Sequence, residues 1–177
     1  MMVTVIGESG SGKSEYAENL IMELAGGSTN SEKMYYIATM KPFGKAAMER
    51  IKRHLELRKG KGFTTIECYK NIENCGLKKG GNVLLECMSN LIANELFDNN
   101  NIDKEDVYYK VCSGIDKLND TVANLVVVTN DVFEDGIIYD KETMEYIELL
   151  GRVNRYLAGI SSKVPFHIVI SHLNILF

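Results

Sequence analysis

The segment "GESGSGKS", residues 7–14, constrains the fold more than any other stretch of the chain. It follows the apolar run "VTVI" and precedes a segment with helical periodicity, so a strand, a glycine-rich loop and a helix come in succession. In the pattern G-x-x-x-x-G-K-[ST], backbone N–H groups turn inward around phosphate oxygens at the positive end of a helix. A Gly/Ser-rich turn without a ligand is the alternative, but the order of the elements favours a nucleoside triphosphate site.

Two side chains of this loop have expected roles in holding a triphosphate. Lys13 can reach the β- and γ-phosphates, and the Ser14 hydroxyl can bind Mg²⁺. A P-loop also needs an acid at the end of a neighbouring strand, which "NVLLEC" supplies as Glu86 and "VVVTND" as Asp131. Because a buried acid is costly without a cation, we expect Glu86 to bind Mg²⁺. Simple exposure at the strand end stays open for both acids, and more so for Asp131.

Short apolar runs rich in β-branched residues recur along the chain and are typical of strands buried on both faces. They are "MVTVIG", "KMYYIAT", "NVLLEC", "NLVVVTN" and "FHIVIS", with a weaker run "FTTIEC" expected at an edge. Helical periodicity predicts helices at about residues 13–25, 44–58, 88–98, 103–121 and 140–160. This alternation predicts an α/β fold, a mostly parallel sheet with helices on both faces, in one domain over residues 1–177. Ligands of such sheets bind beyond the carboxyl ends of the strands.

Composition and charge exclude several classes of protein. A net charge of -4 gives no case for nucleic-acid or membrane-surface binding. No apolar run reaches membrane-spanning length and the N-terminus lacks a basic signal region, so we expect a cytoplasmic protein without membrane insertion. The four cysteines form no CxxC or zinc-like spacing, and we expect free thiols packed as small apolar side chains. They are Cys68, Cys75, Cys87 and Cys112.

The predicted helix at 44–58 contains a histidine within the basic stretch "ERIKRHLELRKGKG". Arg50 lies one turn before His54 and Arg58 one turn after it, so the three form a column. Like charges lower the pKa of the imidazole, and a neutral imidazole beside fixed cations can attack a phosphorus centre. A solvated basic face is the alternative, because one histidine is a weak signal. The apolar stripe of this helix is predicted to pack on the sheet; it consists of Met48, Ile51 and Leu55.

An ordered series of motifs extends over nearly the whole chain. After the P-loop come "YIAT", an R-I-x-x-H string at Arg50, Ile51 and His54, and a W-x-T-x-E-like stretch with Arg58, Phe63, Thr65 and Glu67. "LLEC", "VTND" and "GRVNRYLA" complete the series. In this order the motifs resemble the bifunctional adenosylcobinamide kinase/adenosylcobinamide-phosphate guanylyltransferases of cobalamin biosynthesis.

The resemblance implies a RecA-like P-loop fold, often assembled as a trimer, and two reactions on a corrinoid. A nucleoside triphosphate phosphorylates the hydroxyl of adenosylcobinamide, and GTP then transfers GMP to that phosphate through a guanylylated histidine. His54 matches that histidine, and GTP and ATP are the expected nucleotide substrates. His54 and Lys13 are the expected catalytic residues, and Ser14 and Glu86 the expected Mg²⁺ ligands. The expected nucleotide contacts are Gly7, Glu8, Ser9, Gly10, Ser11, Gly12, Lys13, Ser14, Arg50, Arg58 and Glu67.

Two other functions stay open on the residues alone. One is a P-loop kinase for another small hydroxyl substrate, in which His54 only contacts phosphate. The other is a nucleotide-binding regulatory module with weak turnover. Against the second, "TNDV" is only superficially like the guanine-reading N-K-x-D motif of nucleotide switches.

Overall fold

Five parallel strands, counted over the described residues, form a sheet at the centre of the molecule. The computed structural model describes residues 1–26, 34–98, 103–131 and 139–164. The strand order is β1-β5-β4-β2-β3, so the expected α/β fold is confirmed and β3 lies at an edge, as predicted. The strands are β1 (Met2–Gly7), β2 (Met34–Ala38), β3 (Thr64–Glu67), β4 (Asn82–Glu86) and β5 (Asn124–Asn130). The predicted strand "FHIVIS" lies outside the described residues.

The predicted helices are all present, with boundaries that differ by no more than one residue. They are α1 (Lys13–Leu24), α2 (Gly44–Arg58), α3 (Met88–Phe97), α4 (Lys104–Thr121) and α5 (Lys141–Ile160), with a short 3₁₀ turn η2 (Ile72–Asn74). The carboxylates of Asp103 and Asp140 accept hydrogen bonds from backbone N–H groups and thereby cap α4 and α5. None of these helices, within the part of the chain that the structure describes, is long and apolar enough to cross a membrane.

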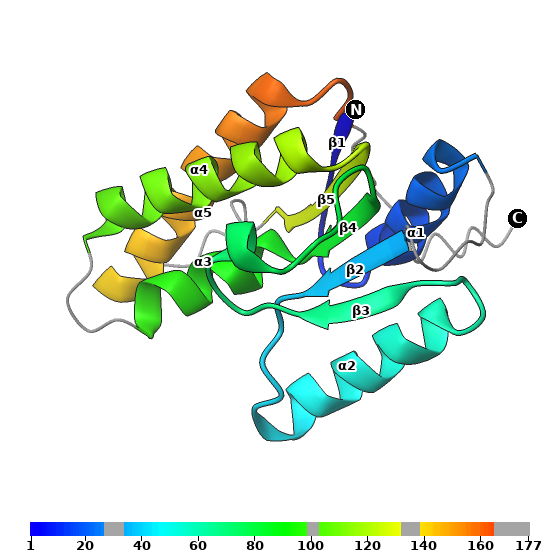
Figure 1. The fold of residues 1–177 in the computed structure, drawn as a ribbon. Helices are drawn as coiled ribbons and strands as arrows, with labels where there is room; N and C mark the ends of the chain where they lie inside the picture. The colour runs from blue at the N-terminus through cyan, green and yellow to red at the C-terminus, as the bar shows by residue number, and fades with distance from the viewer. Residues whose placement is uncertain (27–33, 99–102, 132–138, 165–177) are drawn as a thin grey trace, which may run out of the picture.

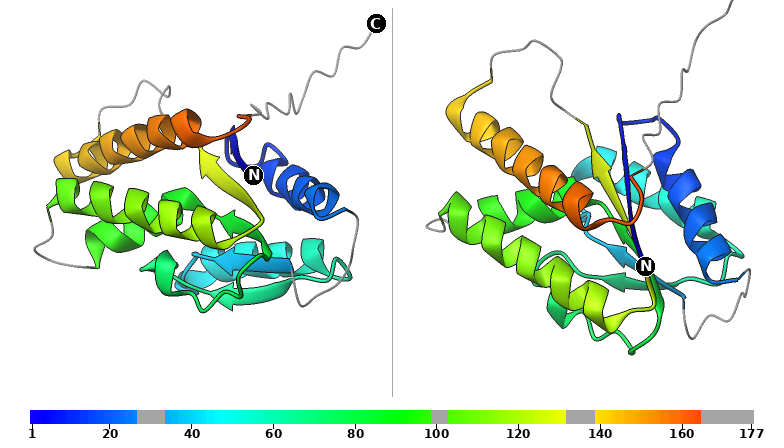
Figure 2. Two further views of the ribbon diagram at one scale, coloured as in Figure 1. Left: turned by 45° about the horizontal axis from the view of Figure 1, so that its top comes forward. Right: turned by 90° about the horizontal axis from the view of Figure 1, so that it is seen from above.

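Strand alternation divides the apolar residues between two cores, one on each face of the sheet. Helix α1 covers one face, and α3, α4 and α5 lie together over the other (Figures 1 and 2). The core under α1 includes Val3, Val5, Leu84, Val126 and Val128 of the strands and Ala17 and Ile21 of the helix. Glu86 follows Leu84 by two residues, so its side chain belongs to the α1 face at the carboxyl end of β4.

Helix α2 lies beyond β3, at the edge of the sheet (Figure 1). The prediction that its apolar stripe packs on the sheet is wrong, because Met48 is 53% and Leu55 51% exposed. Together with Ile51 they line a cavity instead. The periodicity identified a shared helical face correctly, but β3 is short and largely exposed and offers little apolar surface for that face to cover.

Candidate active site

A cavity of about 410 Å³ lies at the carboxyl edge of the sheet, in the size range of small-molecule sites. Its walls come from the P-loop, α2 and the ends of β2, β3, β4 and β5. Most of the predicted site residues line it: Ser9, Gly10, Gly12, Lys13, Ser14, Arg50, His54, Arg58, Glu67 and Glu86. Gly7, Glu8 and Ser11 belong to the loop but are not among the lining residues.

The P-loop folds back on itself between β1 and α1. Gly10 and Gly12 have φ angles of 81° and 80°, in the left-handed region where a side chain is strained. The Glu8 carbonyl accepts hydrogen bonds from the Ser11 N–H, at 3.2 Å, and from Lys13 Nζ, at 2.8 Å. Burial lowers the pKa of Lys13 from its ordinary value. The loop therefore presents a buried amine and the N-terminus of α1 to one end of the cavity.

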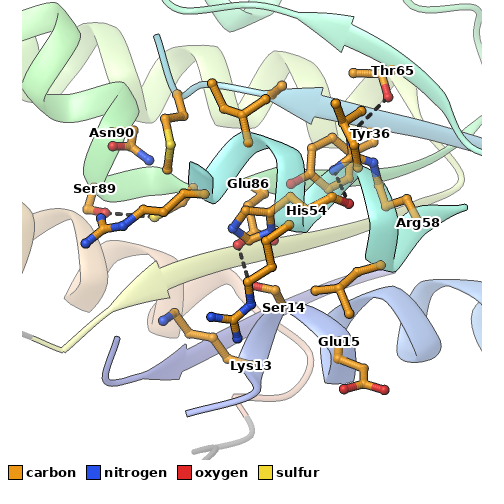
Figure 3. A pocket seen from close by; sticks show the side chains of 18 of the residues that line it. Lys13, Ser14, Glu15, Tyr36, His54, Arg58, Thr65, Glu86, Ser89 and Asn90 are labelled. Atoms are coloured by element: carbon orange, nitrogen blue, oxygen red, sulfur yellow. Dashed lines mark hydrogen bonds between the residues drawn. The ribbon is translucent and has the colours of Figure 1, made fainter. Parts of the chain in front are cut away.

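Ser14 and Glu86 form the closest side-chain pair at the floor of the cavity (Figure 3). The Ser14 hydroxyl donates to Glu86 Oε1 at 2.6 Å, while Glu86 Oε2 is buried and has no hydrogen-bond partner among the described residues. Burial raises the pKa of Glu86 to about 7, against the lowering effects of Ser14 and the Lys13 charge. A hydroxyl and a carboxylate with an unsatisfied oxygen are the hard donors that Mg²⁺ prefers, so these residues fit the ion.

His54 projects from α2 into the same cavity (Figure 3). Its ring is half-buried, and Nδ1 has no hydrogen-bond partner within the described ranges. Burial lowers the pKa of His54 to about 4, followed by the positive charges of Arg58, Arg53, Lys13 and Arg50. The imidazole is therefore neutral at physiological pH, as predicted, although burial contributes more than the column of charges from which we predicted it.

Arg58 connects α2 to the sheet. It is only 7% exposed, and its guanidinium carbon lies 3.5 Å from the centroid of the Tyr36 ring. Nη1 donates to the His54 carbonyl at 3.0 Å, and Nη2 donates to Thr65 Oγ1 at 3.3 Å. A stacked, fork-shaped guanidinium of this kind fixes geometry as well as supplying charge. Of the two predicted arginines, Arg50 is thus the exposed one and Arg58 the one that holds the helix in place.

The sequence comparisons agree with this geometry. A sequence model of the family described as cobinamide kinase / cobinamide phosphate guanyltransferase matches residues 3–174. The chain belongs to this family. It is 28% identical over 177 residues to the bifunctional adenosylcobalamin biosynthesis protein CobU of Escherichia coli (strain K12), with 93% of each chain covered. The protein of the same name from Salmonella typhimurium is 27% identical, again over 93% of each chain.

Membership of the cobinamide kinase / cobinamide phosphate guanyltransferase family confirms the resemblance that the ordered motifs indicated. It also confirms the enzyme class, a transferase of cobalamin biosynthesis that carries out kinase and nucleotidyl-transfer reactions. Nucleoside triphosphates and a corrinoid are the substrates of this family.

Among the cavity residues of this cobinamide kinase / cobinamide phosphate guanyltransferase that sequence reasoning missed are two polar residues that contact each other. Asn130 ends β5 and donates from Nδ2 to the Ser89 hydroxyl at 2.7 Å, and both residues line the cavity. Asp131, the second acid considered as a metal ligand from the sequence, is not among the lining residues. Its backbone N–H donates to the Gly7 carbonyl at 3.2 Å. Strand parity was the available signal, because Asn130 follows Val128 by two residues and so shares the α1 face.

Proposed function

We propose that this one cavity carries out both reactions of the family, with His54 as the residue that becomes guanylylated. The observation that supports the proposal is the position of a neutral imidazole in the same cavity as the P-loop amine of Lys13 and the Ser14–Glu86 pair. A nucleophile for phosphoryl transfer needs a free lone pair, and a triphosphate needs the loop. Here both line the same cavity. The phosphates would take the place of the Glu8 carbonyl as partners of Lys13.

The first half of guanylyl transfer is an in-line displacement at the α-phosphorus of GTP. The lone pair of a His54 ring nitrogen forms the new P–N bond, and the bond from phosphorus to the bridging oxygen breaks. Pyrophosphate leaves with that electron pair, and the ring keeps its other N–H proton. Because the imidazole has a pKa of about 4, it enters the step with its lone pair available across the physiological pH range.

In the second half, a phosphate oxygen of adenosylcobinamide phosphate attacks the same phosphorus. The P–N bond breaks, its electron pair returns to the imidazole, and GMP is joined to the corrinoid phosphate as a phosphoanhydride. The exposed guanidiniums of Arg50 and Arg53 border the cavity and can offset charge on the phosphoryl oxygens in both halves. Arg58 contributes indirectly, because its Nη1 donates to the backbone carbonyl of His54 and so holds the histidine in position.

Ser14 and Glu86 would hold Mg²⁺ for either triphosphate. Bound between these two side chains, Mg²⁺ would supply positive charge that offsets the negative charge of the triphosphate and of its leaving group. Lys13 adds a second positive charge from within the loop, and its burial strengthens the attraction to an anion. In the kinase reaction the same cradle positions the γ-phosphate toward the corrinoid hydroxyl.

We also propose that the chain is one domain over residues 1–177 and assembles as a homo-oligomer, in the trimeric form that the family resemblance implies. Large apolar side chains are exposed on and before α2, most of all Phe43 at 89%. Such a surface suits contact with a second copy of the chain. Light scattering on the purified protein should give a mass three times that of the chain, and a monomeric mass at all concentrations would contradict the assembly.

Labelled GTP separates the two reactions. The protein is incubated with Mg²⁺ and GTP labelled at the α-phosphate, then denatured, and the protein-bound label is measured. We expect label that is acid-labile and alkali-stable, as a phosphoramidate is, and that is lost in His54→Ala. Lys52→Ala is the matched control, because Lys52 is an exposed residue of the same helix that does not line the cavity.

GTP labelled at the γ-phosphate, added with adenosylcobinamide, tests the kinase reaction. Transfer of this label to the corrinoid, without any α-label on a protein that binds GTP, would leave a kinase and remove His54 as nucleophile. Equal α-labelling of wild type and His54→Ala would place the adduct on another residue.

A further inference from the structure

Two of the four cysteines are in direct contact at the edge of the sheet. Cys68 follows β3, Cys75 follows η2, and their Sγ atoms are 2.8 Å apart. Both are free thiols and both are half-buried, whereas Cys87 and Cys112 are buried. As expected, both thiols are free and pack against the apolar core, and their direct contact is a further property of this pair.

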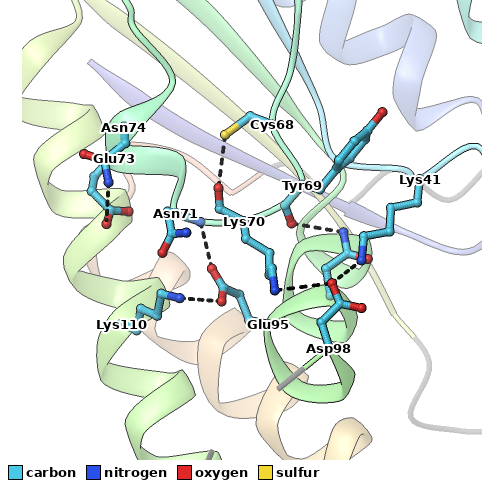
Figure 4. Close-up of polar contacts among 11 residues, drawn as sticks. Lys41, Cys68, Tyr69, Lys70, Asn71, Glu73, Asn74, Glu95, Asp98 and Lys110 are labelled. Carbon is cyan, nitrogen blue, oxygen red and sulfur yellow. Dashed lines mark hydrogen bonds and ion pairs between the residues drawn. The ribbon is translucent and has the colours of Figure 1, made fainter. Parts of the chain in front are cut away.

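The segment between the two thiols is anchored at several points (Figure 4). The N–H of Cys68 donates to the Ala38 carbonyl at 3.0 Å, which continues the β2–β3 pairing. The Asn71 N–H donates to Glu95 Oε1 at 2.8 Å, and Lys110 Nζ donates to Glu95 Oε2 at 2.6 Å. Because these contacts reach both the sheet and two helices, the distance between the thiols is set by the fold and not by a free loop.

The two thiols are chemically unequal. Cys75 Sγ donates to Cys68 Sγ and also lies 2.6 Å from the Ile72 carbonyl. This hydrogen bond lowers the pKa of Cys68, and the Lys70 carbonyl lies 3.3 Å from its sulfur. The pKa of Cys75 is raised by the same contact and by burial. Cys68 is thus the sulfur that forms a thiolate first, with Cys75 placed beside it as a resolving thiol.

We propose that Cys68 and Cys75 are a redox-active dithiol that forms a reversible intramolecular disulfide by exchange with a low-molecular-weight disulfide. The Cys68 thiolate attacks one sulfur of the small disulfide, whose S–S bond breaks, and one small thiolate leaves. Cys75 loses its proton to solvent and attacks Cys68 Sγ, and the second small thiolate leaves. The small disulfide is reduced to two thiols and the protein dithiol is oxidised, so atoms and electrons balance.

Oxidation would act on the wall of the cavity, because Cys68 stands between two lining residues. Glu67 and Tyr69 both line the cavity, and the Tyr69 hydroxyl donates to Glu67 Oε2 at 2.8 Å. The Tyr69 carbonyl also accepts from Asn94 Nδ2 at 3.0 Å. A Cys68–Cys75 bond would join this wall covalently to the end of η2. Oxidation of the thiols would thereby restrain Glu67 and Tyr69 at the substrate site.

Peptide mapping after thiol exchange tests the pair directly. The folded full-length protein is equilibrated with oxidised and reduced glutathione, quenched by acid, alkylated, digested and examined by mass spectrometry. We expect one disulfide, between Cys68 and Cys75, that forms as the glutathione ratio becomes more oxidising and disappears with dithiothreitol. Cys112→Ser should leave the bond unchanged, and Cys75→Ser should leave a stable glutathione adduct on Cys68.

The wild-type map decides the question even if a cysteine variant does not fold. Glutathione retained on Cys68 of the wild type without closure to Cys75 would overturn the proposal. Absence of any change at these two thiols, under conditions that oxidise a control dithiol protein, would overturn it as well. Neither result bears on guanylylation of His54, which does not involve these sulfurs.

Discussion

Replacement of Glu86 by glutamine should change how the stability of the free protein depends on pH. Glutamine retains the shape and an oxygen that can accept from Ser14 Oγ, but it cannot ionise. Burial raises the pKa of Glu86 from its ordinary 4.5 to about 7. The folded wild type therefore keeps a proton that the unfolded chain has already lost between these two values, and ionising the buried carboxyl costs stability.

The sign and the size follow from linkage. The contribution of Glu86 is fully present below about pH 4.5 and is lost as the pH rises through about 7. One pKa unit corresponds to about 1.4 kcal/mol, so a rise of roughly 2.5 in pKa corresponds to about 3 kcal/mol. The free energy of unfolding of the wild type, minus that of Glu86→Gln, should fall by about this amount from pH 4.5 to pH 8. The cost of burying the glutamine amide in Glu86→Gln is the same at both pH values, so it cancels when the two values are compared.

Urea unfolding at a series of pH values, with a chelator and without nucleotide, measures the difference between the two proteins. Glu15→Gln is the matched control, because it removes an exposed carboxyl at the rim of the same cavity. If the difference in free energy of unfolding between wild type and Glu86→Gln does not vary with pH, the raised pKa of the buried Glu86 carboxyl is refuted. Addition of Mg²⁺ and GTP should then stabilise the wild type more than Glu86→Gln.

Three further predictions concern α2 and the contacts that hold it and the segment after it in place. The rate of α-labelling by GTP should persist to about pH 5 and fall only near pH 4, where His54 gains its proton; a midpoint near pH 6.5 would contradict the lowered pKa. Arg58→Lys should slow labelling at least tenfold, because lysine cannot both stack on Tyr36 and hold the His54 carbonyl; unchanged single-turnover rates would exclude this role. Lys61→Ala should lower the free energy of unfolding by about 2 kcal/mol, because it leaves the buried Glu18 without its cation. Urea unfolding measures this loss, and equal stability of Lys61→Ala and wild type would contradict it.

The elements could be predicted from the sequence because local signals and tertiary packing agree along most of the chain. The P-loop fixes the order of strand, loop and helix, and β-branched runs mark strands whose two faces are both covered. The place of Glu86 beside the P-loop was predictable because an acid that ends a buried strand needs a cation nearby, and its binding of Mg²⁺ stays a prediction. The place of His54 in the cavity was predicted from the spacing of the neighbouring arginines together with the family resemblance.

Features that depend on which element lies beside another could not be predicted. The Met48 and Leu55 stripe has helical spacing, but only the fold shows that α2 stands at an edge and turns this stripe to the cavity. The seven-residue separation of Cys68 and Cys75 has no meaning until η2 folds the chain back on β3. Burial, the largest cause of the lowered His54 pKa, is likewise a property of the assembled site.

The most direct measurement of the central proposal is a pulse and chase of the labelled histidine. Protein labelled from α-labelled GTP is freed of nucleotide and mixed with adenosylcobinamide phosphate. We expect the label to leave the His54-containing peptide and to appear in adenosylcobinamide-GDP, without added GTP and at least as fast as turnover. Label that stays on His54, or leaves only as GMP while the corrinoid product forms from fresh GTP alone, would contradict a histidine-bound intermediate.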